Sequence, residues 1–295
     1  MERIKLIVTG DMEKLALHKS LQHLFPLNRN NKKVVWDTPR KLNCATSHRL
    51  RQTALPSSSM RKLAQAMLDE AIISKSGNPA DLVVVIDDVE LGNLEQENII
   101  AEHFRAAVHC CLQEKKYSSD IKDIKEKLRE KCSFHLLKPM VESYLFGDAN
   151  ALRVAGVPQD RIPKLVHPTD VEQFKTDDPL WLPTCQKENE ERQKVTPWWC
   201  HECHPKHYLE DYLIEGEYKE AKNGRNALEK LNWQKVPKCQ TDTIFIRSLF
   251  EDIAAWFDVA NPLEPGETSP YFYPDKSVKY TNLFLRNIIS NGDTL

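Results

Sequence analysis

The sequence predicts an α/β fold, in which a mostly parallel central sheet is flanked by helices and is followed by a largely helical and irregular C-terminal part. The first observation is Leu82–Ile86, an unbroken apolar run of the kind found in strands buried on both faces. The second is Ile4–Val8, which repeats this pattern at the start of the chain. The third is the amphipathic helical spacing between and after these runs, which is typical of a sheet covered by helices.

The elements of the first half follow in alternation. Leucines between residues 15 and 24 have helical spacing, and this helix is expected to end at Pro26. A second apolar helical face runs from Ser59, the expected N-cap, to Ile72. After strand 82–86, Asn93 and Gln96 have the spacing of a capping box that opens another helix.

The chain divides into three predicted regions. Residues 1–156 are expected to form the α/β domain, which is completed by a charged helix from 119 to 130, a third strand within 134–141 and a short helix over 149–155. Segment 157–199 is rich in Pro and charged residues and predicts an extended connection or insertion. Residues 200–295 are expected to be a helical C-terminal part that packs on the first domain.

Charge excludes a globally basic nucleic-acid-binding protein. The 295 residues contain 41 Lys and Arg against 43 Asp and Glu, a formal net charge of −2. Any nucleic-acid binding must therefore use a local patch. Residues 27–58 contain such a basic cluster, which is either a solvated loop or an insertion that contacts phosphate near the acidic strand ends.

The chain is expected to be cytoplasmic. No apolar run approaches the roughly 20 residues that a membrane span requires, and the first residues enter a strand pattern where a signal peptide would need an apolar helix. We therefore expect no membrane partner. The eight cysteines are then predicted to be reduced thiols or metal ligands.

Carboxylates follow each predicted strand. Parallel strands end at one edge of a sheet, where α/β proteins place their ligands. Carboxylates are the hard oxygen donors that Mg²⁺ prefers, and two such ions can support phosphodiester hydrolysis. The alternative is that these residues cap helices and form turns. The candidate metal ligands are Asp11, Glu13, Asp87, Asp88, Glu90 and Glu142.

Two of these acidic segments resemble motifs of the Toprim family. Val8-Thr-Gly-Asp-Met-Glu13 is similar to the first Toprim motif, and Val83-Val-Val-Ile-Asp-Asp-Val-Glu90 is similar to the second. Segment 119–152 and the later stretches 218–224 and 245–250 resemble an uncharacterised prokaryotic Toprim-related family. The resemblance covers about two thirds of the chain, with its motifs in the family's order.

The resemblance implies a function. Related proteins resemble the overcoming-lysogenisation-defect nucleases, which cut nucleic acid with Mg²⁺ or Mn²⁺ and often act beside an ATPase in defence against phage. On this basis Asp88 and Glu90 would hold the ion, Glu13 would share it, and Lys206 would stabilise the transition state. The implied partners are nucleic acid and an ATPase.

The chain departs from the Toprim pattern at two positions. Thr9 stands where the first motif has its glutamate, and Asp88-Val-Glu90 replaces the usual Asp-x-Asp. Either Asp11 and Glu13 have taken over the ligand role, or the domain has lost catalysis. The second alternative is a Toprim-derived binding or regulatory module that contacts an ATPase or nucleic acid.

A second constellation lies further along the chain. The spacing within residues 200–207 suits tetrahedral zinc, although no second paired knuckle accompanies it. The alternative is that its histidines start a helix or bind phosphate. The candidate zinc ligands are Cys200, Cys203, His204 and His207.

Overall fold

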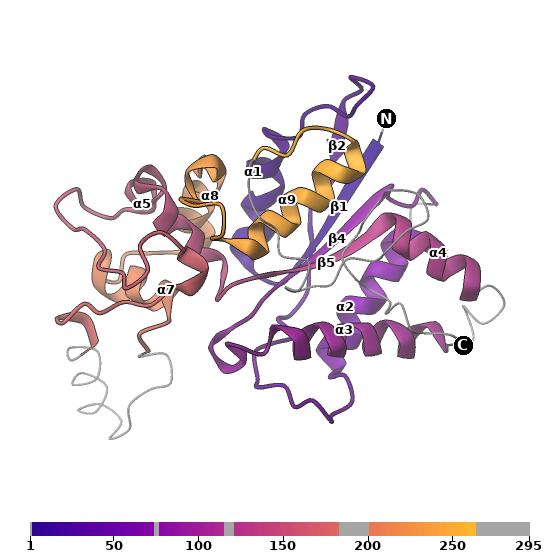
Figure 1. The fold of residues 1–295 in the computed structure, drawn as a ribbon, viewed down its shortest axis with the longest axis horizontal. Coiled ribbons are helices and arrows are strands. Elements are labelled where there is room, and N and C mark those ends of the chain that lie inside the picture. The colour runs from indigo at the N-terminus through magenta and orange to yellow at the C-terminus, as the bar shows by residue number, and fades with distance from the viewer. Residues whose placement is uncertain (1, 74–76, 115–120, 183–200, 264–295) are drawn as a thin grey trace.

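A computed structural model describes residues 2–73, 77–114, 121–182 and 201–263, and its centre is a five-stranded sheet (Figure 1). The strand order is β2-β1-β4-β5, and β3 also pairs with β1. Every pairing between these strands is parallel, which confirms the predicted α/β class. The strands are β1 (Glu2–Val8), β2 (Val34–Trp36), β3 (Arg40–Lys41), β4 (Leu82–Asp88) and β5 (Cys132–Leu137).

The two apolar runs that led to the prediction are direct neighbours. The register places Ile4 opposite Leu82 and Ile7 opposite Val85, so β1 and β4 end side by side. On the other side of β4, Asp88 lies opposite Leu137 of β5. All three carboxyl ends therefore meet at one edge of the sheet, as predicted.

The side chains of β1 and β4 alternate between two cores. Leu82, Val84 and Ile86 face one core, which also contains the first helix and residues of the C-terminal part. Val83 and Val85 face the other core, which contains helices α2 and α3. This alternation is the two-residue period of a strand, and it fixes the face onto which each acidic residue at the strand end projects.

Helices cover both faces of the sheet (Figure 1). The first helix begins as a π-helical segment, Glu13–Leu17, and continues as α1. The α-helices are α1 (His18–Gln22), α2 (Ser58–Leu68), α3 (Glu97–Leu112), α4 (Ile121–Lys131), α5 (Ala149–Ala155), α7 (Pro205–His207), α8 (Arg225–Lys230) and α9 (Ile244–Phe257). Further π-helical segments are Asp69–Ile73, Tyr208–Leu213 and Glu220–Gly224, and short 3-10 helices are Leu91–Asn93, Val141–Gly147, Val171–Gln173 and Trp233–Lys235.

Two predicted helix caps are wrong. The N-cap of α2 is Ser57, whose hydroxyl accepts a hydrogen bond from the Met60 amide at 3.1 Å, so the helix begins before Ser59. The side chain of Asn93 does not cap α3. It accepts from the Leu50 amide at 2.8 Å and donates to the Thr46 carbonyl at 2.7 Å, because Thr46 and Leu50, the buried ends of loop 46–50, require partners for these backbone groups.

The C-terminal part lies against the carboxyl edge of the sheet. Figure 1 shows α5, α7 and α8 grouped beyond the ends of β1, β4 and β5, while α9 runs along one face of the sheet. Buried residues of this part, including Tyr208 and Trp233, belong to the same apolar core as Ile4 and Val84. The strand ends are thereby enclosed between the sheet and these helices.

Candidate functional site

A cluster of carboxylates occupies the enclosed carboxyl edge of the sheet. Glu13 lies at the start of the first helix, Asp88 ends β4, and Glu142 lies in the 3-10 helix that follows β5. Their side chains are buried, with relative exposures of 1%, 9% and 3%. Glu90, two residues after Asp88, is partly buried beside them. The fold thus brings together four of the six predicted metal ligands.

Gly10 gives the Glu13 carboxylate its position. A Cβ atom built on Gly10 would lie 2.1 Å from Glu13 Oε2, so any side chain at this position would overlap the carboxylate. The Glu13 side chain therefore folds back over the turn between β1 and the first helix. A side chain at position 10 would therefore displace the Glu13 carboxylate.

Burial and mutual repulsion disfavour ionisation of the cluster. Burial, with the charges of Glu142 and Glu220, raises the pKa of Glu13 to about 8. Burial, followed by repulsion from Glu13, Glu90 and Glu142, raises the pKa of Asp88 well above its ordinary value. Burial raises the pKa of Glu142 to about 7. Perturbed carboxyl groups of this kind gather at functional sites because catalysis and ion binding use them.

Among the described residues, two carboxylate oxygens of this cluster have no hydrogen-bond partner. Glu13 Oε2 and Asp88 Oδ1 are both buried and unpaired. An unpaired polar atom costs free energy when it is removed from water, so native proteins rarely keep one without a reason. These oxygens are hard donors available to a cation.

Glu90 has a strained backbone at the mouth of the cluster. Its φ of 64° and ψ of 155° lie in a region that L-residues seldom adopt. The Glu90 amide donates to the Pro139 carbonyl at 2.9 Å, which fixes this conformation. Strain of about 1–3 kcal/mol at such residues is typical of functional sites.

A lysine and a further glutamate complete the site from the C-terminal part. Lys206 Nζ lies 2.9 Å from Glu220 Oε2. Burial lowers the pKa of Lys206, but the charges of Glu142 and Glu220 outweigh burial and raise it above its ordinary value. Sequence reasoning selected Lys206 and missed Glu220, whose other oxygen accepts from the amides of Asp11 and Met12, both at 3.0 Å.

The remaining two predicted ligands, Asp87 and Asp11, make other contacts, although the charge of Asp87 still acts on Asp88 and Glu90. Asp87 faces the opposite side of the sheet and accepts from the Thr9 hydroxyl at 2.6 Å and from the Ala45 amide at 3.2 Å. Burial, partly offset by these hydrogen bonds, raises its pKa to about 6. Asp11 is half-exposed and pairs with Lys41 at 2.6 Å. These two carboxylates therefore have structural partners.

The described part of the alternative zinc group makes other contacts. Cys200 lies outside the described residues. His204 Nδ1 accepts from the His207 amide at 3.3 Å, and His207 Nδ1 lies 2.8 Å from Asp211. Within the described ranges, no three His, Cys, Asp or Glu side chains are placed to share one metal ion, either around Cys203 or in the acidic cluster.

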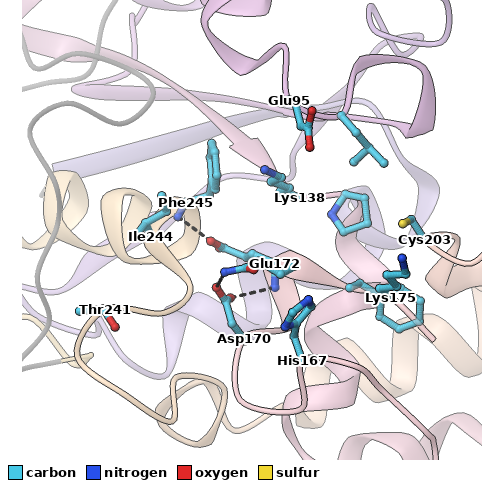
Figure 2. Close-up of a pocket in the computed structure, with 14 residues that line it drawn as sticks. Glu95, Lys138, His167, Asp170, Glu172, Lys175, Cys203, Thr241, Ile244 and Phe245 are labelled. Atoms are coloured by element: carbon cyan, nitrogen blue, oxygen red, sulfur yellow. Dashed lines mark hydrogen bonds between the residues drawn. The ribbon is translucent and has the colours of Figure 1, made fainter. Parts of the chain in front are cut away.

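A pocket of about 420 Å³ opens at the end of β5 (Figure 2). Its walls include Phe174 and Phe245, and Lys138 projects into it from the strand end. Lys138 is paired with Glu97, and its ammonium lies 5.5 Å from the centre of the Phe245 ring. None of the clustered carboxylates lines this pocket, so we do not place the chemistry there.

A buried Ser–His–Asp contact chain is structural. His135 Nδ1 lies 3.4 Å from Ser248 Oγ, and His135 Nε2 lies 3.3 Å from Asp252 Oδ2. All three residues are almost completely buried between β5 and α9. The Ser248 hydroxyl donates to the Phe245 carbonyl at 2.7 Å within α9, so its proton is not directed at His135, although the order of contacts is that of a hydrolase triad.

No protein family, curated protein or solved structure matches the chain. In the described residues, no helix has both the length and the apolar composition needed to cross a membrane.

The first prediction concerns Gly10. Gly10→Ala should displace the Glu13 carboxylate, because the new methyl group would occupy its position. The side chain is flexible, so the melting temperature should change by only a few degrees, whereas stabilisation by Mn²⁺ should be lost. Thermal unfolding with and without Mn²⁺ measures both effects. Retention of the full Mn²⁺ effect in Gly10→Ala would contradict the assigned position of Glu13.

Proposed function

We propose that this protein is a metal-dependent phosphodiesterase of Toprim-like type that cuts nucleic acid. The observation that carries the proposal is the pair of buried, unpaired oxygens on Glu13 and Asp88 at the carboxyl edge of a parallel sheet. Three further groups support it. The charges of Glu90 and Glu142 repel Asp88. The charge of Lys206 attracts both Glu90 and Glu142.

The donor chemistry fits Mg²⁺ or Mn²⁺. Mg²⁺ is usually held by one or two carboxylates with water and substrate phosphate, so Asp88 and Glu13 suffice as the first ligands. Glu90 and Glu142 would complete the shell through water, because in the described residues no three such side chains are placed to share one ion. When bound, the ion supplies an activated water and stabilises negative charge on phosphate oxygens.

The chain's own residues then have distinct roles. Gly10 leaves room for the Glu13 carboxylate over the turn, and Glu90, on its strained backbone, adds a charge that acts on Asp88. Lys206 places a cation beside the carboxylates, where it can neutralise charge that develops on a phosphoryl group. Glu220 positions Lys206 and also caps the first helix.

Asp88→Asn tests the proposal. Wild-type protein is expected to cleave mixed DNA and RNA substrates with Mg²⁺ or Mn²⁺ and to be stabilised by either ion, because a cation relieves carboxylate repulsion. Asp88→Asn should lose both properties. Glu126→Gln, on the exposed face of α4, is the matched control and should behave as wild type. A metal-induced rise in melting temperature that is equal in Asp88→Asn and wild type would contradict the site.

A second candidate function is favoured by Thr9. The Thr9 hydroxyl donates to Asp87. Thr9 stands where the first Toprim motif has a glutamate, so in this chain that position has a structural role. On this reading the protein is a Toprim-derived regulatory module that works with an ATPase or nucleic acid, as in the phage-defence systems of the resembling family. Metal-dependent stabilisation without cleavage of any substrate would favour the module.

A further inference from the structure

A basic pocket lies next to the carboxylate cluster. It has a volume of about 370 Å³ and is lined by three lysines, Lys14, Lys41 and Lys62, together with Ser59 and Asn43. The lysines come from three elements: the first helix, the end of β3 and the first turns of α2. Three lysines that line one pocket form a local basic patch in a chain whose net charge is −2.

The charge of this pocket is only partly balanced. Lys41 pairs with Asp11 at 2.6 Å. In the described parts of the chain, Lys14 and Lys62 form no ion pair, and both are exposed. Like charges repel one another, so an anion that joins the three lysines is favoured over an empty cavity. The pocket therefore selects an anionic ligand, and its hydroxyl and amide groups suit an oxyanion.

The pocket and the carboxylates share one turn of the chain. Glu13 turns inward to the cluster, whereas its neighbour Lys14 turns outward to the pocket. Consecutive Cα atoms are about 3.8 Å apart, so the two sites lie on opposite sides of a single helical turn. Lys41 also lies near this turn, because it pairs with Val8 at the end of β1.

We propose that Lys14, Lys41 and Lys62 bind a phosphate of the nucleic-acid strand that is cut at Glu13 and Asp88. The inference rests on the proposed function, since the carboxylates define which phosphate is cut. Lysines that contact phosphate position a strand without reading its sequence. Asp11 competes with this phosphate for Lys41, so it lowers the affinity of the pocket.

The test is oligonucleotide binding without metal. Fluorescence anisotropy in EDTA with a labelled single strand and a labelled duplex, from about 50 to 200 mM salt, separates phosphate contacts from other interactions. The variant Lys14→Gln/Lys41→Gln/Lys62→Gln should bind about tenfold more weakly at low salt, with a salt slope smaller by about one. Asp11→Asn should bind several-fold more tightly.

A matched control removes the same charge elsewhere. Lys32, Lys122 and Lys127 are exposed lysines that precede β2 or lie in α4, away from the carboxyl edge, and their triple Gln variant should bind within about twofold of wild type. Equal losses in the two triple variants would overturn the pocket assignment. Stabilisation by inorganic phosphate without oligonucleotide binding would also overturn it.

The same samples separate this inference from the proposed function. Melting temperatures with and without Mn²⁺ report on the carboxylates, which the lysine substitutions leave in place. If the Mn²⁺ effect persists while the pocket variant binds oligonucleotide as wild type does, the phosphate site is wrong and the metal site stands. A different outcome is that Mn²⁺ does not stabilise wild type, while the pocket variant binds oligonucleotide more weakly than wild type. The binding site then stands without the catalytic one.

Discussion

Glu13→Gln is expected to raise the stability of the metal-free protein above pH 7 and to abolish metal-dependent cleavage. The stability effect follows from the pKa of about 8, against an ordinary value of 4.5. Between these values the folded state retains a proton that the unfolded state releases. The free energy of unfolding therefore falls as pH rises, by about 1.4 kcal/mol per pH unit for one such carboxyl.

The free energy of unfolding of Glu13→Gln does not fall with pH in this way, because glutamine does not ionise. Its melting temperature at pH 8 should exceed that of wild type by several degrees, since 1 kcal/mol corresponds to roughly 2–4 °C in a chain of this size. At pH 4.5 the two proteins should melt together. Cleavage should fall by about 10²–10⁴-fold, because the variant has lost an anionic group that holds the ion.

Opposite signs for stability and activity distinguish a functional carboxylate from a structural one. Thermal unfolding from pH 4.5 to 8 and a cleavage assay with Mn²⁺ measure the two quantities on the same protein, and Glu126→Gln serves again as the surface control. Mn²⁺ should stabilise wild type more at pH 8 than at pH 6, because protons compete for the same oxygens. A less stable Glu13→Gln protein at pH 8 would assign Glu13 to a structural role.

The sheet could be predicted because strands that are buried on both faces are visible in the sequence as continuous apolar runs. The runs 4–8 and 82–86 are apolar at every position except Lys5. Two parallel strands that are buried between helices are expected to be neighbours in the sheet. The inward position of Asp88 follows from the same alternation, which places it on the face of Val84 and Ile86. Asp87, one residue earlier, had to face the other core.

The rest of the site depends on contacts between distant segments. Glu220 reaches the first helix across more than two hundred positions, and its π-helical segment has no apolar period that marks its place. Asn93 has the spacing of a helix cap, but its side chain instead pairs with the backbone groups of the buried residues Thr46 and Leu50. Local patterns cannot reveal such choices, because the competing partner comes from tertiary structure.

Thr9→Glu is expected to destabilise the protein strongly and to leave cleavage no faster than in wild type. Thr9 is buried, and its hydroxyl is the closest hydrogen-bond donor to the buried Asp87 carboxylate. A glutamate at this position removes the donor and adds a second carboxylate beside Asp87. The cost of an uncompensated buried charge is about 3–5 kcal/mol.

Thr9→Val separates the loss of the hydrogen bond from the addition of a buried carboxylate. Valine keeps the shape of threonine and removes only the hydrogen bond, so it should cost about 1–3 kcal/mol. Thr9→Glu should therefore unfold at a lower denaturant concentration than Thr9→Val, and the difference should grow with pH as the new carboxyl ionises. Urea unfolding of both variants at pH 6 and pH 8 measures this difference.

The outcome also decides between the two candidate functions. The Toprim pattern has a glutamate where this chain has Thr9, so a degenerate catalytic domain should regain cleavage when that residue is restored. The geometry argues otherwise, because Thr9 and Asp87 face the core of α2 and α3, whereas Glu13 and Asp88 face the enclosed edge. A Thr9→Glu protein that folds normally and cleaves only with that substitution would establish the regulatory module. A destabilised Thr9→Glu protein, beside an active wild type, would mean that catalysis in this chain uses the opposite face of the same two strands.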